Sequence, residues 1–356
     1  MRKIESVQGL RAAAALSVAV LHILHDAIPL DPSGFAARWH DALPWQAGVD
    51  LFFVISGFVM VHASADLFGR RSGPLVFMTR RLARIVPLYW ATTTLVLVAA
   101  LIAPAAVSHD DLGIGSVIKS YLFVPAIASS GFIQPVYSLG WTLNYEMFFY
   151  VVFATFISQP RPRALLLVGV LLGGLIACHG IVPSGAIPLV FWTDPIMAEF
   201  LLGMAIGAVA TTRLSLPDWL RASAFMLALA ALVIGHASGF AAPEPIGVGI
   251  PMAILVAMAV LGRPVPIPAT VLLVGEASYA LYLVHPFAMR AVSLLWRALH
   301  LTGTAAAAGY VAASLILALL AAVATHLWFE RRVSTWLRSR LARFWVPRVP
   351  APRAAI

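Results

Sequence analysis

Hydrophobic positions along the chain form long continuous runs, and short stretches between these runs hold most of the charged residues. A helix needs roughly 20 mostly apolar residues to cross about 30 Å of hydrocarbon. By that measure the pattern predicts ten spans, at approximately 7–28, 46–63, 85–107, 136–157, 164–182, 194–211, 222–239, 246–262, 269–289 and 304–328. We therefore predict an all-α integral membrane protein, a bundle of about ten transmembrane helices.

The composition agrees with this fold class. Of the 356 residues, 61% are hydrophobic and 11% are charged, whereas a typical soluble domain is about 45–50% apolar and about 25% charged. The one cysteine, Cys178, excludes an internal disulfide and any metal site built on cysteine pairs, and we expect no metal. The basic residues flank apolar runs, so the lipid bilayer is the expected partner and nucleic acid is not.

The distribution of positive charge predicts the orientation of the chain. If the N-terminus is cytoplasmic, the inner loops and tails hold 19 of the 24 Lys and Arg residues, and the outer loops hold four. Such a bias is typical of loops that stay in the cytoplasm. We expect a multi-pass membrane protein with both termini inside.

The end of the chain is basic and amphipathic. Apolar residues recur there at helical spacing with arginines between them, at Val333, Trp336, Leu337, Leu341 and Phe344. We expect a transmembrane domain over 1–330 and a basic cytoplasmic tail over 331–356, whose amphipathic helix lies on the inner leaflet. Residues 346–356, which include three prolines, are expected to be disordered.

Several ionisable side chains fall inside the predicted spans, where each costs several kcal/mol and therefore needs a reason. They are Arg11, His22, His25, Asp50, Glu146, Glu199, Glu276 and His285. Structural pairing across the bundle explains any one of them taken alone. The whole set favours a functional site inside the membrane.

Arg11 and His22 are eleven residues apart, so they lie on one face of a helix, roughly 16 Å apart along its axis. A neutral imidazole can exchange a proton near neutral pH, and a carboxylate beside it would fix its tautomer. Asp50 and Glu146 are the candidates for that carboxylate. The alternative is a buried histidine that only bonds a backbone carbonyl.

A second group of charges opens the third predicted span. Arg81 and Arg84 are i,i+3 neighbours, so their guanidinium groups can converge at the inner membrane surface, where they suit phosphate geometry. On spacing alone the stronger alternative is that they follow the positive-inside rule and meet lipid headgroups.

Five stretches, taken in order, resemble the acyltransferase-three family of bacterial membrane proteins, most closely members that decorate exopolysaccharides. They are the run from Gln8 through Arg11 to His22, then Gly48–Phe58, Arg81–Pro87, Ser138–Tyr150 and Gly275–Pro286. Each motif is weak alone, but five in order across nearly the whole chain are specific. Thr142 stands where many members have serine, and the chain has no hydrolase-like domain outside the membrane, which some members carry.

The resemblance implies a ten-helix domain that moves an acyl group, commonly acetyl, from cytoplasmic acyl-CoA to a sugar hydroxyl at or beyond the outer face. It implies that His22 is the catalytic base or acyl relay, and that Arg81 and Arg84 bind the donor together with Arg11. The expected partners are acyl-CoA, with acetyl-CoA favoured, and a polysaccharide or lipid-linked sugar as acceptor.

The chemistry of acyl transfer agrees with this reading, because it needs a base, a phosphate-binding donor site and help for an oxyanion. Candidate contacts to the substrate or to the oxyanion are Trp141, Tyr150, Ser56 and His285. The rival hypothesis is a transporter or flippase of lipid-linked sugars, since intramembrane histidines and carboxylates also build relays. Against it, the two halves of the chain show no obvious hydropathy repeat.

Overall fold

The computed structural model describes residues 4–31, 34–102, 112–212, 214–239, 243 and 245–345. The regular elements in these ranges are helical, apart from one isolated bridge between Ile127 and Ile133. The α-helices are α1 (Glu5–Ala27), α2 (Phe35–Ala42), α3 (Ala47–Ala63), α4 (Gly73–Ile102), α5 (Ile114–Tyr121), α6 (Trp141–Phe156), α7 (Arg161–Ala177), α8 (Ile187–Trp192), α9 (Ala198–Val209), α10 (Asp218–Ser238), α11 (Ile250–Val260), α12 (Ala269–Glu276), α13 (Ser278–Ala298), α14 (Thr304–Thr325) and α15 (Arg331–Trp345). The predicted all-α fold class is confirmed.

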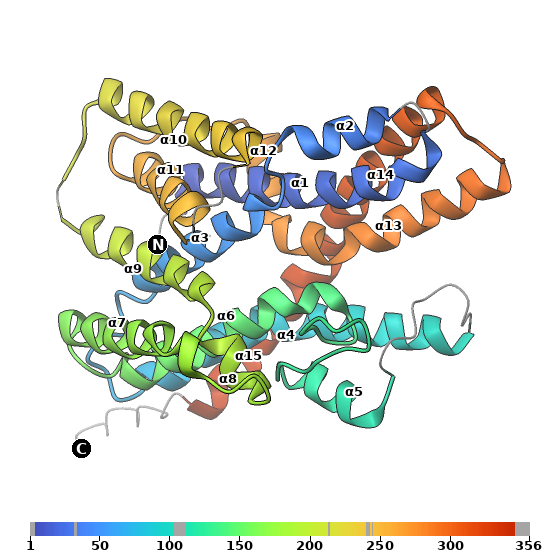
Figure 1. Cartoon of the computed structure of the whole chain (residues 1–356). Helices are drawn as coiled ribbons and strands as arrows, with labels where there is room; N and C mark the ends of the chain where they lie inside the picture. The colour runs from blue at the N-terminus through green and yellow to red at the C-terminus, as the bar shows by residue number, and fades with distance from the viewer. Residues whose placement is uncertain are drawn as a thin grey trace, which may run out of the picture.

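The helices form two halves, with the candidate site between them. In Figure 1, α1, α2, α10, α11 and α13 lie in one half, and α4 to α8 with α15 lie in the other. Helix α1 is central to the first half, because it contacts α2, α3, α12, α13 and α14. The path from α14 through the π-helical turn His326–Glu330 into α15 crosses from one half to the other (Figure 1).

Helices α3 and α9 approach each other closely because glycines face the contact. A Cβ atom on Gly57 would lie 2.1 Å from the carbonyl oxygen of Phe200, and one on Gly203 would lie 2.0 Å from that of Val54. Small residues allow helix backbones to pack this tightly in membrane proteins, where dispersion contacts drive association. This contact holds α3, which lines the site, in a fixed position.

Five segments of the described chain are long and apolar enough to cross a membrane, and a sixth is added if one bent pair counts as a single span. They mark the chain as a membrane protein. The predicted count of ten is not confirmed, because α6, α7, α9 and α11 have only 16, 17, 12 and 11 residues. Even with the short turns before α9 and α11, the segments Pro195–Val209 and Pro245–Val260 stay below the length of a full span.

Two predicted spans differ from the helices in the structure. The span expected at 269–289 is broken, since α12 and α13 meet at an angle of 76°. The span expected from residue 85 begins at Gly73, because arginine is a good helix former and continues the helix through residues 80–84. The mean hydropathy of a sequence window detects neither a bend in a helix nor a charged stretch, such as residues 80–84, through which the helix continues.

The basic tail is helical over α15 and packs against α4. It follows directly on α14 through the π-helical turn. Trp336 is exposed, and the guanidinium of Arg340 lies 5.7 Å from its ring centroid. The expected disordered end, 346–356, lies outside the described residues.

Candidate active site

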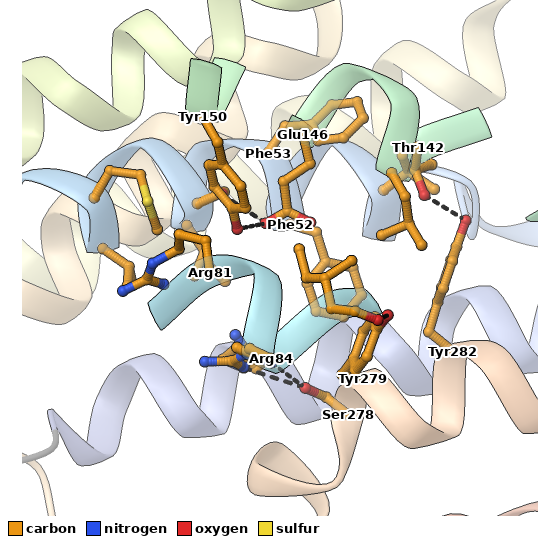
Figure 2. Close-up of a pocket in the computed structure, with 18 residues that line it drawn as sticks. Phe52, Phe53, Arg81, Arg84, Thr142, Glu146, Tyr150, Ser278, Tyr279 and Tyr282 are labelled. Carbon is orange, nitrogen blue, oxygen red and sulfur yellow. Dashed lines mark hydrogen bonds between the residues drawn. The ribbon is translucent and has the colours of Figure 1, made fainter. Parts of the chain in front are cut away.

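A cavity of about 730 Å³, including its mouth, lies between the two halves of the protein. Helices α1, α3, α4, α6 and α13 line it. Figure 2 shows that charged and hydroxyl side chains surround it among aromatic and aliphatic ones. The polar lining consists of Arg11, Ser56, Arg81, Arg84, Thr142, Glu146, Tyr150, Ser278, Tyr279 and Tyr282.

Arg81 and Arg84 lie one helical turn apart on α4, and both line the cavity. Arg81 is buried, and its guanidinium carbon lies 5.7 Å from the ring centroid of Phe77 and 6.0 Å from that of Tyr150. Its Nε atom is buried without a hydrogen-bond partner among the described residues. A buried donor of this kind is normally satisfied, so it is available to a ligand in the cavity.

Arg11 joins these two arginines from α1. Its Nη2 donates to Ser278 Oγ at 2.8 Å, and its Nε lies 3.2 Å from the same oxygen and 3.4 Å from the Gly275 carbonyl. Gly275 and Ser278 flank the bend between α12 and α13. Arg11 therefore holds the broken span as well as facing the cavity.

Glu146 projects into the cavity from α6. The Ser56 hydroxyl donates to Glu146 Oε1 at 2.9 Å, and the Tyr150 hydroxyl, one turn along α6, donates to the same oxygen (Figure 2). Ser56 and Tyr150, predicted as contacts to substrate or oxyanion, thus line the cavity but direct their hydroxyl protons at this carboxylate. Two hydroxyl donors thus hold this carboxylate in place.

His22 lies on the same face of α1 as Arg11, as the eleven-residue spacing predicts, and both side chains meet residues of α13. Nδ1 of His22 lies 2.8 Å from Nε2 of His285, and the two ring planes are nearly parallel, at 9°, with centroids 5.1 Å apart. The sequence predicted Asp50 or Glu146 as the partner of His22, and that prediction is wrong. The packing of α1 against α13 places a second histidine there.

Asp50 and Trp141 lie apart from these groups. Asp50 is buried in the first turn of α3, where its side chain lies beside that of Glu199 on α9. Trp141 packs edge-on against Phe53 and Tyr145, with centroid distances of 6.4 Å and 5.9 Å. Neither lines the cavity.

Two side chains that the sequence analysis did not single out, Ser278 and Tyr282, help to form the site together with Thr142. Ser278 accepts from Arg11, Tyr282 donates to the Leu139 carbonyl at 3.0 Å, and the Thr142 hydroxyl donates to Tyr282 at 3.0 Å (Figure 2). The sequence did contain a signal for Ser278 and Tyr282. Residues 278, 282 and 285 are spaced by four and three positions, so they share one face of α13.

No three His, Cys, Asp or Glu side chains in the described ranges converge in a way that could hold a metal ion. The site instead offers guanidinium groups at one end of the cavity, a hydrogen-bonded carboxylate in it, and a histidine pair beside Tyr282. The ring centroids of Tyr282 and His285 are 6.5 Å apart. The three arginines and the carboxylate of Glu146 thus line one internal space, whereas His22 and His285 are not among the residues that line it.

The family model described as an acyltransferase domain matches residues 4–326. The chain belongs to the acyltransferase-three family. This acyltransferase is 36% identical over 263 residues to the exopolysaccharide production protein ExoZ of Rhizobium meliloti (strain 1021). The aligned region covers 69% of this chain and 77% of ExoZ. It is 28% identical over 320 residues to the acyltransferase MdmB of Streptomyces mycarofaciens, and the aligned region covers 81% of this chain and 79% of MdmB. None of the solved structures gives a significant match.

Membership of the family settles the class of the protein. It is a transferase, an enzyme that acts on an acyl donor and an acceptor. The resemblance carried by the five sequence motifs is confirmed over nearly the whole length of the acyltransferase.

Proposed function

We propose that this protein transfers an acetyl group from cytoplasmic acetyl-CoA to a hydroxyl group of a cell-surface or exported polysaccharide or glycolipid. The convergence of Arg11, Arg81 and Arg84 on one cavity carries the proposal. Guanidinium groups bind phosphates through a planar fork of N–H donors, and acyl-CoA is an acyl donor that carries phosphates. The name of the relative ExoZ supports a polysaccharide as acceptor.

In the proposed reaction, the acceptor hydroxyl oxygen attacks the carbonyl carbon of the thioester. A carbon–oxygen bond forms and the carbon–sulfur bond breaks. The His22 imidazole takes the hydroxyl proton as general base and returns it to the departing thiolate, so an ester and a free thiol result. Arg11 and His22 stand roughly 16 Å apart along α1, which suits a donor whose phosphates and reactive carbon are joined by a long arm.

Glu146 is the second candidate for the base. Its carboxylate lines the cavity that the three arginines share, and Ser56 and Tyr150 already hold one of its oxygens. This environment favours a charged carboxylate that counters the arginines when no donor is bound. We therefore rank His22 first.

We further propose ten spans in the bacterial inner membrane with both termini in the cytoplasm. The 19 cations on one side of the predicted topology and four on the other support this orientation. The donor is charged and cytoplasmic, so the end of the cavity at Arg81 and Arg84 opens inward. Residues 1–330 form the acyltransferase domain, and the basic tail 331–356 lies at the inner leaflet, where its arginines meet anionic lipid.

Vesicles that contain the purified protein test the proposal. We expect acetyl-CoA labelled in its acetyl group to transfer label to added polysaccharide, in an ester linkage that mild base cleaves. The label should not appear without protein or with free acetate in place of acetyl-CoA. Movement of a lipid-linked sugar across the vesicle membrane without any label transfer would instead support a transporter or flippase.

A further inference from the structure

In the contact between His22 and His285 one ring nitrogen must donate and the other must accept. A second hydrogen bond of His285 identifies which one donates. Nδ1 of His285 lies 3.0 Å from the carbonyl oxygen of Leu281. A carbonyl oxygen only accepts, so this nitrogen carries a hydrogen. Among the described residues, Nε2 of His285 is bonded to His22, at 2.8 Å.

The side chain of His285 is completely buried, with no exposed area. A cationic imidazole is costly there, because no carboxylate contacts it within the part of the chain that the structure describes. A neutral imidazole has one N–H and one lone pair, so Nε2 of His285 must be an acceptor. The hydrogen between Nδ1 of His22 and Nε2 of His285 therefore belongs to Nδ1 of His22. The lone pair of the neutral His22 ring then lies on its Nε2.

The helix around His285 is built to hold that tautomer. Pro286 follows directly, and because proline has no N–H it leaves the carbonyl of Tyr282, four residues before it, without its helical partner. In the same turn the Leu281 carbonyl accepts from Nδ1 of His285 at 3.0 Å, and this acceptor fixes the hydrogen on that nitrogen.

We propose that His285 is a positioning residue, which holds His22 with its hydrogen on Nδ1 and its free lone pair on Nε2, directed away from α13 toward the reacting hydroxyl. The proposal rests on the proposed function, since it assigns His285 a role in the proton transfer at His22. In Ser-His-Asp triads an aspartate does this for the catalytic imidazole. A neutral histidine does the same without placing a carboxylate at membrane depth.

Two substitutions separate positioning from a structural role. In His285→Gln, the amide oxygen reaches the place of Nε2 and can still accept from His22. In His285→Met, the side chain fills the same space but accepts only weakly. We expect kcat for acetyl transfer to fall about 10²-fold in the Met variant, the lower end of what a positioned base contributes. The Gln variant should recover most of that loss.

The matched control is His300→Met, which makes the same exchange just beyond the end of α13, where the side chain is exposed. It should keep the wild-type kcat. The KM for acetyl-CoA should stay unchanged in all three variants. Equal kcat in the Gln and Met variants, whether both are wild-type or both are impaired, would overturn the proposal, as would a change confined to KM.

A second measurement needs no variant to be active. In protein labelled with ¹⁵N-histidine, the signal missing from His22→Asn identifies the His22 ring. We expect a protonated Nδ1 and an unprotonated Nε2, and a protonated Nε2 would refute the inference. If the wild type transferred no acetyl group at all, the proposed function would fail. The measured tautomer of His22 would still confirm or refute the inference about His285.

Discussion

Arg11 and Ser278 join the first helix to the bend between α12 and α13, through N–H donors 2.8 Å and 3.2 Å from one hydroxyl oxygen. Gly275, on the other side of the bend, packs so closely on α1 that an added Cβ would lie 2.1 Å from the Gln8 carbonyl oxygen. A charged donor and a close backbone contact thus hold the bend. The arginine that faces the cavity is also part of the framework that shapes it.

Ser278→Ala should therefore destabilise the protein. It leaves the Arg11 guanidinium without its main acceptor, and hydrogen bonds to charged groups contribute about 1.5–3 kcal/mol. We expect a lower temperature of half-unfolding in detergent and a weaker response to acetyl-CoA. The control is Ser339→Ala, on the exposed face of α15. Unchanged stability of Ser278→Ala would show that the bend does not depend on this contact.

The sequence predicted part of this arrangement. The spacing of Arg11 and His22 placed both on one helical face, and both side chains do meet α13. Their partners were not predictable, because Ser278 and His285 are more than 260 positions away and only the packing of α1 on α13 brings them together. Local periodicity defines a face but not the helix that covers it.

The extent of the spans was also only partly predictable. Hydropathy located the apolar segments but could not detect the bend at Ala277, since the average over 269–289 is the same for a straight and a bent helix. Asp50 was predicted as a candidate partner of His22. It instead faces α9, where its side chain meets Glu199.

Arg81→Lys combined with Arg84→Lys tests the donor site. Lysine keeps the positive charge, so insertion should be normal, but it lacks the planar fork that binds phosphate with two bonds. We expect a KM for acetyl-CoA about tenfold higher and an unchanged KM for the acceptor. Arg80→Lys is the control, because Arg80 pairs with Asp66 at 3.4 Å and does not line the main cavity. An unaltered KM in the double variant would leave the two arginines as topology signals.

Gly203→Ala tests the close packing of α3 and α9. The added Cβ would lie 2.0 Å from the Val54 carbonyl oxygen, so the helices must separate. Overpacking of this kind costs about 1–3 kcal/mol, and we expect a lower temperature of half-unfolding. Gly173→Ala is the matched control on α7, where nothing lies within 4 Å of the new atom. Equal stability of the two variants would contradict the tight contact.

Reporter fusions test the orientation. Fusions after Arg163 and after Ile356 should both report the cytoplasm, because both positions fall on the side that holds most of the cations. A fusion after His300 should report the outer side. Opposite sides for the first two would contradict the ten-span topology and the inward-facing donor site.

The rate of acetyl transfer by His22→Ala tests the central claim most directly. The variant should fold as the wild type does and bind acetyl-CoA, because the side chain of His22 is only half-buried and Arg11, Arg81 and Arg84 are unchanged. In vesicles at saturating acetyl-CoA, we expect the transfer rate to fall about 10²–10⁴-fold, the contribution of a general base. A His22→Ala protein that transfers acetyl groups at the wild-type rate would contradict the account.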